Sequence, residues 1–172
     1  MNITDFKKAM RLEFFRLDSD TTLSDSLLST YYDESVDNIF NELMTVEDKT
    51  QLPFYNSYTY TIVTPGNSFA LETTKNIIEI NSIMINTTAL SDIIVLNKAP
   101  LSEIMMNYNE LLAYFNMINT KTIRLNTSTS GIISYEAIVV EDAKALIESL
   151  GNYDSVILEN GKVLCKNYLG LY

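Results

Sequence analysis

The chain has 172 residues, enough for one domain whose hydrophobic core needs neither disulfides nor structural metals. Hydrophobic residues make up 47% of it and charged residues 20%, a composition that excludes a wholly disordered chain. The formal net charge of −10 argues against nucleic-acid-binding and membrane-surface proteins, because phosphates and anionic lipids carry the same sign.

The N-terminal part has the apolar spacing of two helices. From Ile3 to Leu17 apolar residues recur every three or four positions, and Thr4 is placed to cap this first helix. A polar break over Asp18–Thr22 ends it. A second, longer helix follows Ser24, with acidic residues on its outer face. Residues 1–45 are therefore predicted to form a helical hairpin.

The middle of the chain changes to the composition of β-strands. Pro65-Gly66-Asn67 has the residues of a turn, and the interrupted alternation at Asn81-Ser82 predicts a β-bulge. The strands predicted around these two features are Tyr58–Thr64, Ser68–Thr73, Asn76–Asn86 and Asp92–Leu96.

Two more helices and another pair of strands are expected further on. Apolar periodicity predicts a helix over Ser102–Phe115. The strands Thr122–Leu125 and Ile132–Val140 are joined by the polar stretch TSTSG, which predicts a hairpin. Glu141–Leu150 predicts a short helix that Gly151 would close as its C′ residue.

The C-terminal segment is compatible with two structures. Asn160-Gly161 is a preferred pair for a two-residue turn, which predicts a β-hairpin over Val156–Lys166. A helix would instead align Ile157, Leu164, Tyr168 and Leu171 on one stripe. It would hold Gly161 in its interior, at a cost of about 1 kcal/mol. The turn chemistry favours the hairpin.

These elements predict an α+β fold in which the N-terminal helical hairpin packs on an antiparallel β-sheet with one or two further helices. Residues 46–172 would form the β-rich portion of the same single domain. No stretch approaches the ~18 apolar residues that a membrane span needs. Charged residues also interrupt the N-terminal segment, so we expect no signal peptide and synthesis in a cytoplasm.

Side chains that commonly carry catalysis are scarce. The chain has no histidine, and its five glycines form no phosphate-binding pattern. The single cysteine, Cys165, lies in an apolar run and is expected in the core. Asp18 and Asp20 could hold a divalent cation in a metal-dependent enzyme, but a linker between helices explains them better. We predict no enzyme activity, no catalytic, cofactor-binding or metal-binding residue, and no cofactor.

Tyrosines and apolar residues in two segments are the candidate contacts with partners. Because the chain has few lysines and no arginine after Arg124, we interpret them as protein-interface residues, or alternatively as ordinary residues at the edge of the core, rather than as base-stacking platforms. The candidate interface residues are Tyr55, Tyr58, Tyr60, Tyr168, Leu169, Leu171 and Tyr172.

An α-hairpin is followed by TYTIVTP, SFALETTKNIIEINSIMIN, a helix and KTIRLNTSTSGIISYEAIVV. Over residues 3–140 this order resembles the head-to-tail connector (adaptor or neck ring) proteins of tailed bacteriophages. Thr127–Ser130 departs from the family's proline-containing segment, and Asn160-Gly161 departs from its C-terminal helix.

The resemblance implies a virion structural protein that assembles as a ring oligomer in the host cytoplasm, around a passive DNA channel. Its expected partners are the portal, other ring or tail proteins and further copies of itself, with no sequence-specific nucleic acid and no membrane. The composition also fits an alternative, a soluble accessory or regulatory protein-binding domain that acts as a monomer or dimer.

Overall fold

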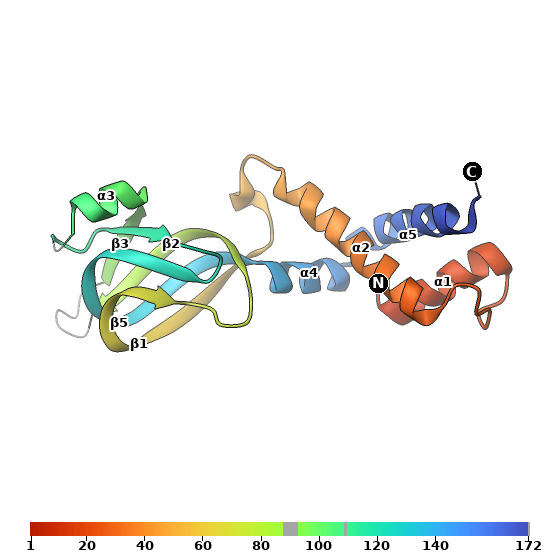
Figure 1. Ribbon diagram of the computed structural model, residues 1–172, viewed down its shortest axis with the longest axis horizontal. Helices are drawn as coiled ribbons and strands as arrows, with labels where there is room; N and C mark the ends of the chain where they lie inside the picture. The colour runs from red at the N-terminus through yellow and green to blue at the C-terminus, as the bar shows by residue number, and fades with distance from the viewer. Residues whose placement is uncertain (88–92, 109, 172) are drawn as a thin grey trace. The chain divides into compact units, whose positions relative to one another are not determined.

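The computed structural model describes residues 1–87, 93–108 and 110–171 (Figure 1). The chain is α+β, as predicted, and the predicted N-terminal helical hairpin is present. The chain divides into two compact units. The helical unit comprises Met1–Gln51 and Ala143–Tyr172, and the sheet unit comprises Leu52–Asp142.

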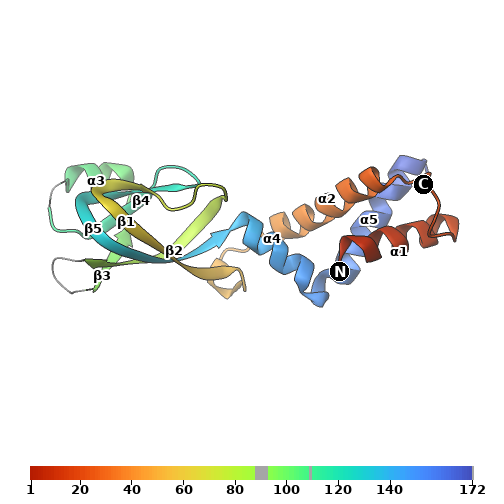
Figure 2. The same ribbon diagram turned by 90° about the horizontal axis from the view of Figure 1, so that it is seen from below.

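The helical unit is a bundle in which α5 packs against both α1 and α2 (Figures 1 and 2). Asn2 caps α1 by accepting a hydrogen bond from the Asp5 amide, so the predicted cap at Thr4 is wrong. Ser24 caps α2. The helices are α1 (Ile3–Phe15), α2 (Asp25–Met44), α4 (Val140–Ser149) and α5 (Asp154–Leu169), with 3₁₀ turns η1 (Lys49–Gln51) and η2 (Gly151–Tyr153).

The C-terminal segment is the helix α5, so the predicted hairpin over Val156–Lys166 is wrong. Ile157, Gly161 and Cys165 lie four residues apart and form the buried stripe of this helix. At Gly161 an added Cβ would lie 2.4 Å from Cε2 of Phe6 on α1. The glycine therefore permits close packing of two helices rather than a turn.

A glycine ends α5 in the left-handed conformation, but the glycine after α4 does not have this role. The predicted C′ role of Gly151 is wrong, because this residue begins η2. Gly170, with φ 67°, ends α5 in the left-handed conformation instead. The buried hydrophobic side chains of the helical unit are Phe6, Met10, Leu23, Leu28, Tyr32, Val36, Ile39, Phe40, Ala143, Ile147, Ile157 and Cys165.

The sheet unit is a mixed five-stranded sheet of order β1-β5-β2-β3-β4. β4 also pairs with β5, so the pairings β5–β2–β3–β4–β5 form a closed ring and the sheet curls (Figure 2). β3 and β4 are parallel and the other pairs are antiparallel. The elements are β1 (Tyr55–Ala70), β2 (Ile77–Thr87), β3 (Ile93–Lys98), α3 (Leu101–Met106), β4 (Tyr114–Met117) and β5 (Thr122–Val139).

Two hairpins predicted from turn residues are wrong, because β1 and β5 are each continuous long strands. β1 passes through Pro65-Gly66 with register shifts between Ile62 and Ser68. A proline is tolerated there because β1 is the edge strand, and among the described residues no further strand needs its missing N–H. β5 passes through TSTSG and bends at Gly131, where φ is 131° and a Cβ would lie 2.0 Å from the Asn86 carbonyl oxygen.

The helix predicted over Ser102–Phe115 is wrong in extent. α3 ends at Met106, and Phe115 is buried within β4. The predicted bulge in β2 is confirmed by a register shift between Ile80 and Ser82. The core of the sheet unit contains Ile62, Phe69, Leu71, Ile77, Ile80, Ile83, Ile85, Leu96, Leu112, Phe115, Ile123, Leu125, Ile133, Tyr135, Ala137 and Val139.

Candidate interaction surfaces

Tyr58, one of the candidate interface residues, is held in a polar cluster of the sheet unit. Its hydroxyl donates to Oδ2 of Asp142 at 2.7 Å, and Nζ of Lys75 donates to Oδ1 of the same carboxylate at 2.7 Å. The ring stacks on Tyr135 with centroids 5.3 Å apart. Tyr58 is therefore fixed in position by both its ring and its hydroxyl.

The charges in this cluster are set by burial and by hydrogen bonds. Burial, reinforced by the hydrogen bond to Asp142, raises the pKa of Tyr58 well above its usual range. The hydrogen bonds from Lys75 and from Tyr58 lower the pKa of Asp142. The phenol is a permanent donor and the carboxylate a permanent acceptor at neutral pH. The phenol therefore donates its hydrogen bond to the carboxylate, and the two groups do not form an acid–base pair for catalysis.

The other candidate tyrosines fall into two groups. β1 carries Tyr55 and Tyr60, both half-buried, and the Tyr60 ring lies 6.1 Å from that of Phe69. The second group belongs to the end of α5, where Tyr168 is exposed. In this group Leu169 is half-buried, Leu171 is exposed, and Tyr172 lies outside the described residues. The structure thus brings together Tyr58 and Tyr60 on one face of β1, places Tyr55 on the other face, and leaves the α5 residues in a different unit.

A surface that the sequence reasoning missed lies on the outside of the curled sheet. Two cross-strand rows form it, each running over β1, β5, β2 and β3. One row is Thr59, Ser134, Met84 and Val95, and the other is Thr61, Ile132, Asn86 and Ile93. We call these eight residues the outer face. None of them is charged, and all but the half-buried Ser134 are exposed.

The outer face is apolar at several positions. Ile93 is 67% exposed and Val95 62%, and Val63 continues the face along β1 at 89%. The next row contains Glu136, which accepts hydrogen bonds from Asn81 and Ser82 and so marks the charged boundary. The sequence signal for this face was present in the run from Ile93 to Leu96, where apolar residues occupy both faces of a strand.

A second exposed apolar surface follows β3. The segment around α3 displays Leu101, Met105, Met106, Tyr108 and Leu111, which we call the α3 patch. Met106 is 83% exposed and Leu111 85%. Exposed methionines suit an adaptable protein contact, because their side chains are flexible and polarisable.

One buried side chain holds the chain beside the α3 patch. Asn126 on β5 is fully buried and makes four hydrogen bonds. Its Oδ1 accepts from the Ala113 and Tyr114 amides, each at 3.0 Å. Its Nδ2 donates to the Asn107 and Leu111 carbonyls at 3.2 and 2.9 Å. The α3 patch is therefore presented by a backbone tied into the sheet.

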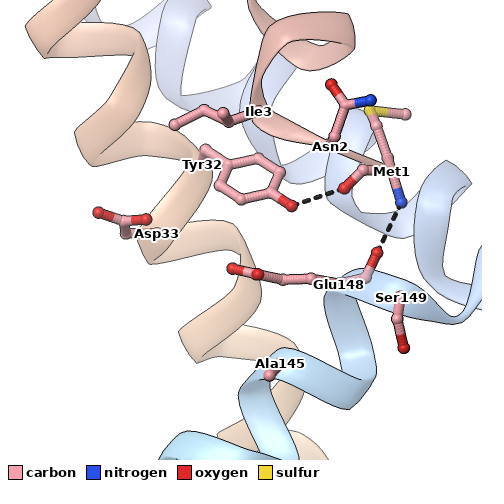
Figure 3. A pocket seen from close by; sticks show the side chains of 8 residues that line it. All are labelled: Met1, Asn2, Ile3, Tyr32, Asp33, Ala145, Glu148 and Ser149. Atoms are coloured by element: carbon pink, nitrogen blue, oxygen red, sulfur yellow. Dashed lines mark hydrogen bonds between the residues drawn. The ribbon is translucent and has the colours of Figure 1, made fainter.

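The helical unit has an open pocket of about 410 Å³ (Figure 3). The Tyr32 hydroxyl donates to the Met1 carbonyl at 2.6 Å, and the Met1 ammonium donates to the Glu148 carbonyl at 2.9 Å and also to Asp154. Burial raises the pKa of Tyr32 to about 12. These polar groups bond to one another, and the arrangement contains no nucleophile paired with a base among the residues drawn in Figure 3.

Other sequence candidates have ordinary surroundings. Asp20 accepts a hydrogen bond from the Thr22 amide in the turn after α1. Cys165 is buried as predicted, and burial raises the pKa of its thiol to about 11. Within the described ranges no three His, Cys, Asp or Glu side chains are arranged to hold a metal ion. The same ranges contain no helix that is both long and apolar enough to cross a membrane.

No protein-family model and no curated protein matches this sequence. The two apolar surfaces are therefore interpreted from their own chemistry.

Proposed function

We propose that this chain is a structural assembly subunit that binds neighbouring proteins through its sheet unit. The observation that supports the proposal is the uncharged outer face in a chain of net charge −10. Charged residues are depleted from the cores of protein interfaces, and contiguous exposed apolar surfaces commonly mark sites of protein contact.

The energy available at such a contact is substantial. Covering an exposed valine, isoleucine or methionine contributes on the order of 1–2 kcal/mol. Val63, Ile93, Val95, Ile132 and Met84 together could therefore support a specific interface once the cost of association is met. The fixed backbone beside the α3 patch adds a second, preorganised contact surface.

Within this class we propose a subunit of a phage neck or tail ring, a head-to-tail connector located in the virion. The order of elements that resembles connectors supports it, as does the acidic charge, since a DNA channel must not grip phosphate. Its neighbours would be the portal, other ring or tail proteins and further copies of the chain. The connector would act by holding proteins together and would perform no catalysis.

The test places a charge in the middle of the outer face. We expect Ile132→Lys to abolish incorporation of the chain into virus particles, because the contact would bury an unpaired ammonium. Asn152→Lys, at an exposed position of the helical unit, adds the same charge and should leave incorporation unchanged. Particles from complemented infections would be analysed by mass spectrometry and by immunogold labelling at the neck.

If the parent chain is absent from purified particles, the connector proposal is wrong. The alternative is an accessory protein-binding domain that acts as a monomer or dimer. A soluble partner captured by the parent and lost with Ile132→Lys would support that alternative.

A further inference from the structure

β1 is the edge strand of the sheet as the structure describes it. Along one side it pairs with β5 over nearly its whole length, from Tyr55 to Ala70. It is the end strand of the sheet, and no other strand of the described chain pairs with it. An edge of this kind presents a row of backbone N–H and C=O groups that another strand can satisfy.

The devices that normally protect such an edge are missing from half of β1. Residues 50–71 contain no charged side chain, although charges on edge strands are a common protection. Pro65 and the register shifts between Ile62 and Ser68 would hinder pairing, but they lie in the C-terminal half of the strand. Asn56–Ile62 pairs with β5 without a register shift and offers seven regular residues.

The exposed backbone groups of the edge favour a β-strand as the binding partner. The charge distribution of the chain favours β1 of a second copy as that strand. Two copies with a net charge of −10 repel one another over most of their surfaces. β1 and the adjoining outer face are where copies can approach without juxtaposing carboxylates. An antiparallel pair of identical strands also satisfies both edges at once in a closed two-fold contact.

We propose that two copies of this chain pair their β1 strands antiparallel over Asn56–Ile62, which joins the two sheets into one. A two-fold axis perpendicular to the sheet keeps both outer faces on the same side. Thr59 of one copy then lies opposite or next to Thr59 of the other. The inward-facing Tyr58 and Tyr60 of both copies become cross-strand neighbours, where aromatic pairs stabilise a sheet.

This inference deepens the proposed function and rests on it, because it supplies a two-fold contact of the assembly, separate from the head-to-tail contacts that close a ring. Sedimentation velocity of the full chain, from low micromolar to submillimolar concentration, should show a reversible dimer. Thr59→Lys should weaken dimerisation about tenfold or more, because it sets two ammonium groups against each other. Ser134→Lys is the matched control, since it places the same charge in the same cross-strand row but on β5.

Two measurements separate a lost contact from a damaged fold. An equimolar mixture of Thr59→Lys and Thr59→Glu should recover a heterodimer, since the two charges attract across the axis. Hydrogen exchange should show extra protection of backbone amides within Asn56–Ile62 as the parent concentration rises.

The proposal is overturned by a parent that stays monomeric throughout, or by Thr59→Lys that dimerises like the parent. It is also overturned if Ser134→Lys weakens dimerisation as much, because the contact would then be the outer face and not the edge. These outcomes are independent of particle incorporation. A monomeric parent that still enters particles would contradict the β1 contact alone, and a dimer absent from particles would contradict the connector alone.

Discussion

At the scale of single residues, Gly161 shows how one contact decides a local structure. In an isolated helix Gly→Ala is stabilising by about 1 kcal/mol. In this chain we expect Gly161→Ala to lower the free energy of unfolding by about 1–3 kcal/mol, because the new methyl group would overlap the Phe6 ring. Chemical denaturation of parent and variant measures the difference.

Asn167→Ala is the matched control, at an exposed position of the same helix, and should be neutral or slightly stabilising. Phe6→Leu should be less harmful in the Gly161→Ala background than in the parent, since it makes room for the methyl group. A Gly161→Ala variant more stable than the parent would contradict the close packing of α1 on α5.

Residue identity alone could predict some positions and not others. Cys165 was correctly placed in the core, because its neighbours in the sequence are apolar. Gly161 was misinterpreted, because Asn160-Gly161 has the chemistry of a turn and nothing local identifies Phe6 as a neighbour. The information that decides between hairpin and helix lies about 150 residues away, in a tertiary contact.

At the scale of elements, apolar periodicity predicts the type of element correctly where the pattern lies within that one segment. α1, α2 and the bulged strand β2 follow their apolar spacing. Turn residues do not predict turns in β1 and β5. Pro65 lies within the edge strand β1, and Gly131 lies at the bend of β5. The run from Ile93 to Leu96 indicates an exposed apolar face on one strand, but the extent of the outer face depends on pairing between four strands and cannot be predicted from one segment.

Asn126 tests whether a single side chain organises the connection from α3 to β4. We expect Asn126→Ala to lower the free energy of unfolding by about 2–3 kcal/mol, because it leaves buried backbone groups without partners. The Ala113 and Tyr114 amides, which donate to Asn126, should lose protection in hydrogen exchange. Asn86→Ala, at an exposed strand position, should change stability by well under 1 kcal/mol. Unchanged protection of both amides in Asn126→Ala would contradict this role.

At the scale of the whole molecule, carboxylates lie beside the place where basic residues gather on α1. Lys7, Lys8 and Arg11 line one pocket of the helical unit, but Asp18 and Asp25 line the same pocket. The Arg11 guanidinium donates to the Leu23 carbonyl and to the Asp25 carboxylate. The positive charge of Arg11 is therefore paired with a carboxylate within the fold.

We expect the parent chain not to retard duplex or single-stranded DNA at physiological salt, because its net charge is −10 and two carboxylates lie beside the basic cluster on α1. Gel shift and fluorescence anisotropy would measure this. The double variant Asp18→Asn, Asp25→Asn removes two negative charges beside that cluster and should bind weakly at low salt only, since phosphate contacts fall steeply with salt. Salt-sensitive micromolar binding by the parent would reveal an uncompensated basic surface. A connector that lets DNA pass without gripping it would then no longer describe this protein.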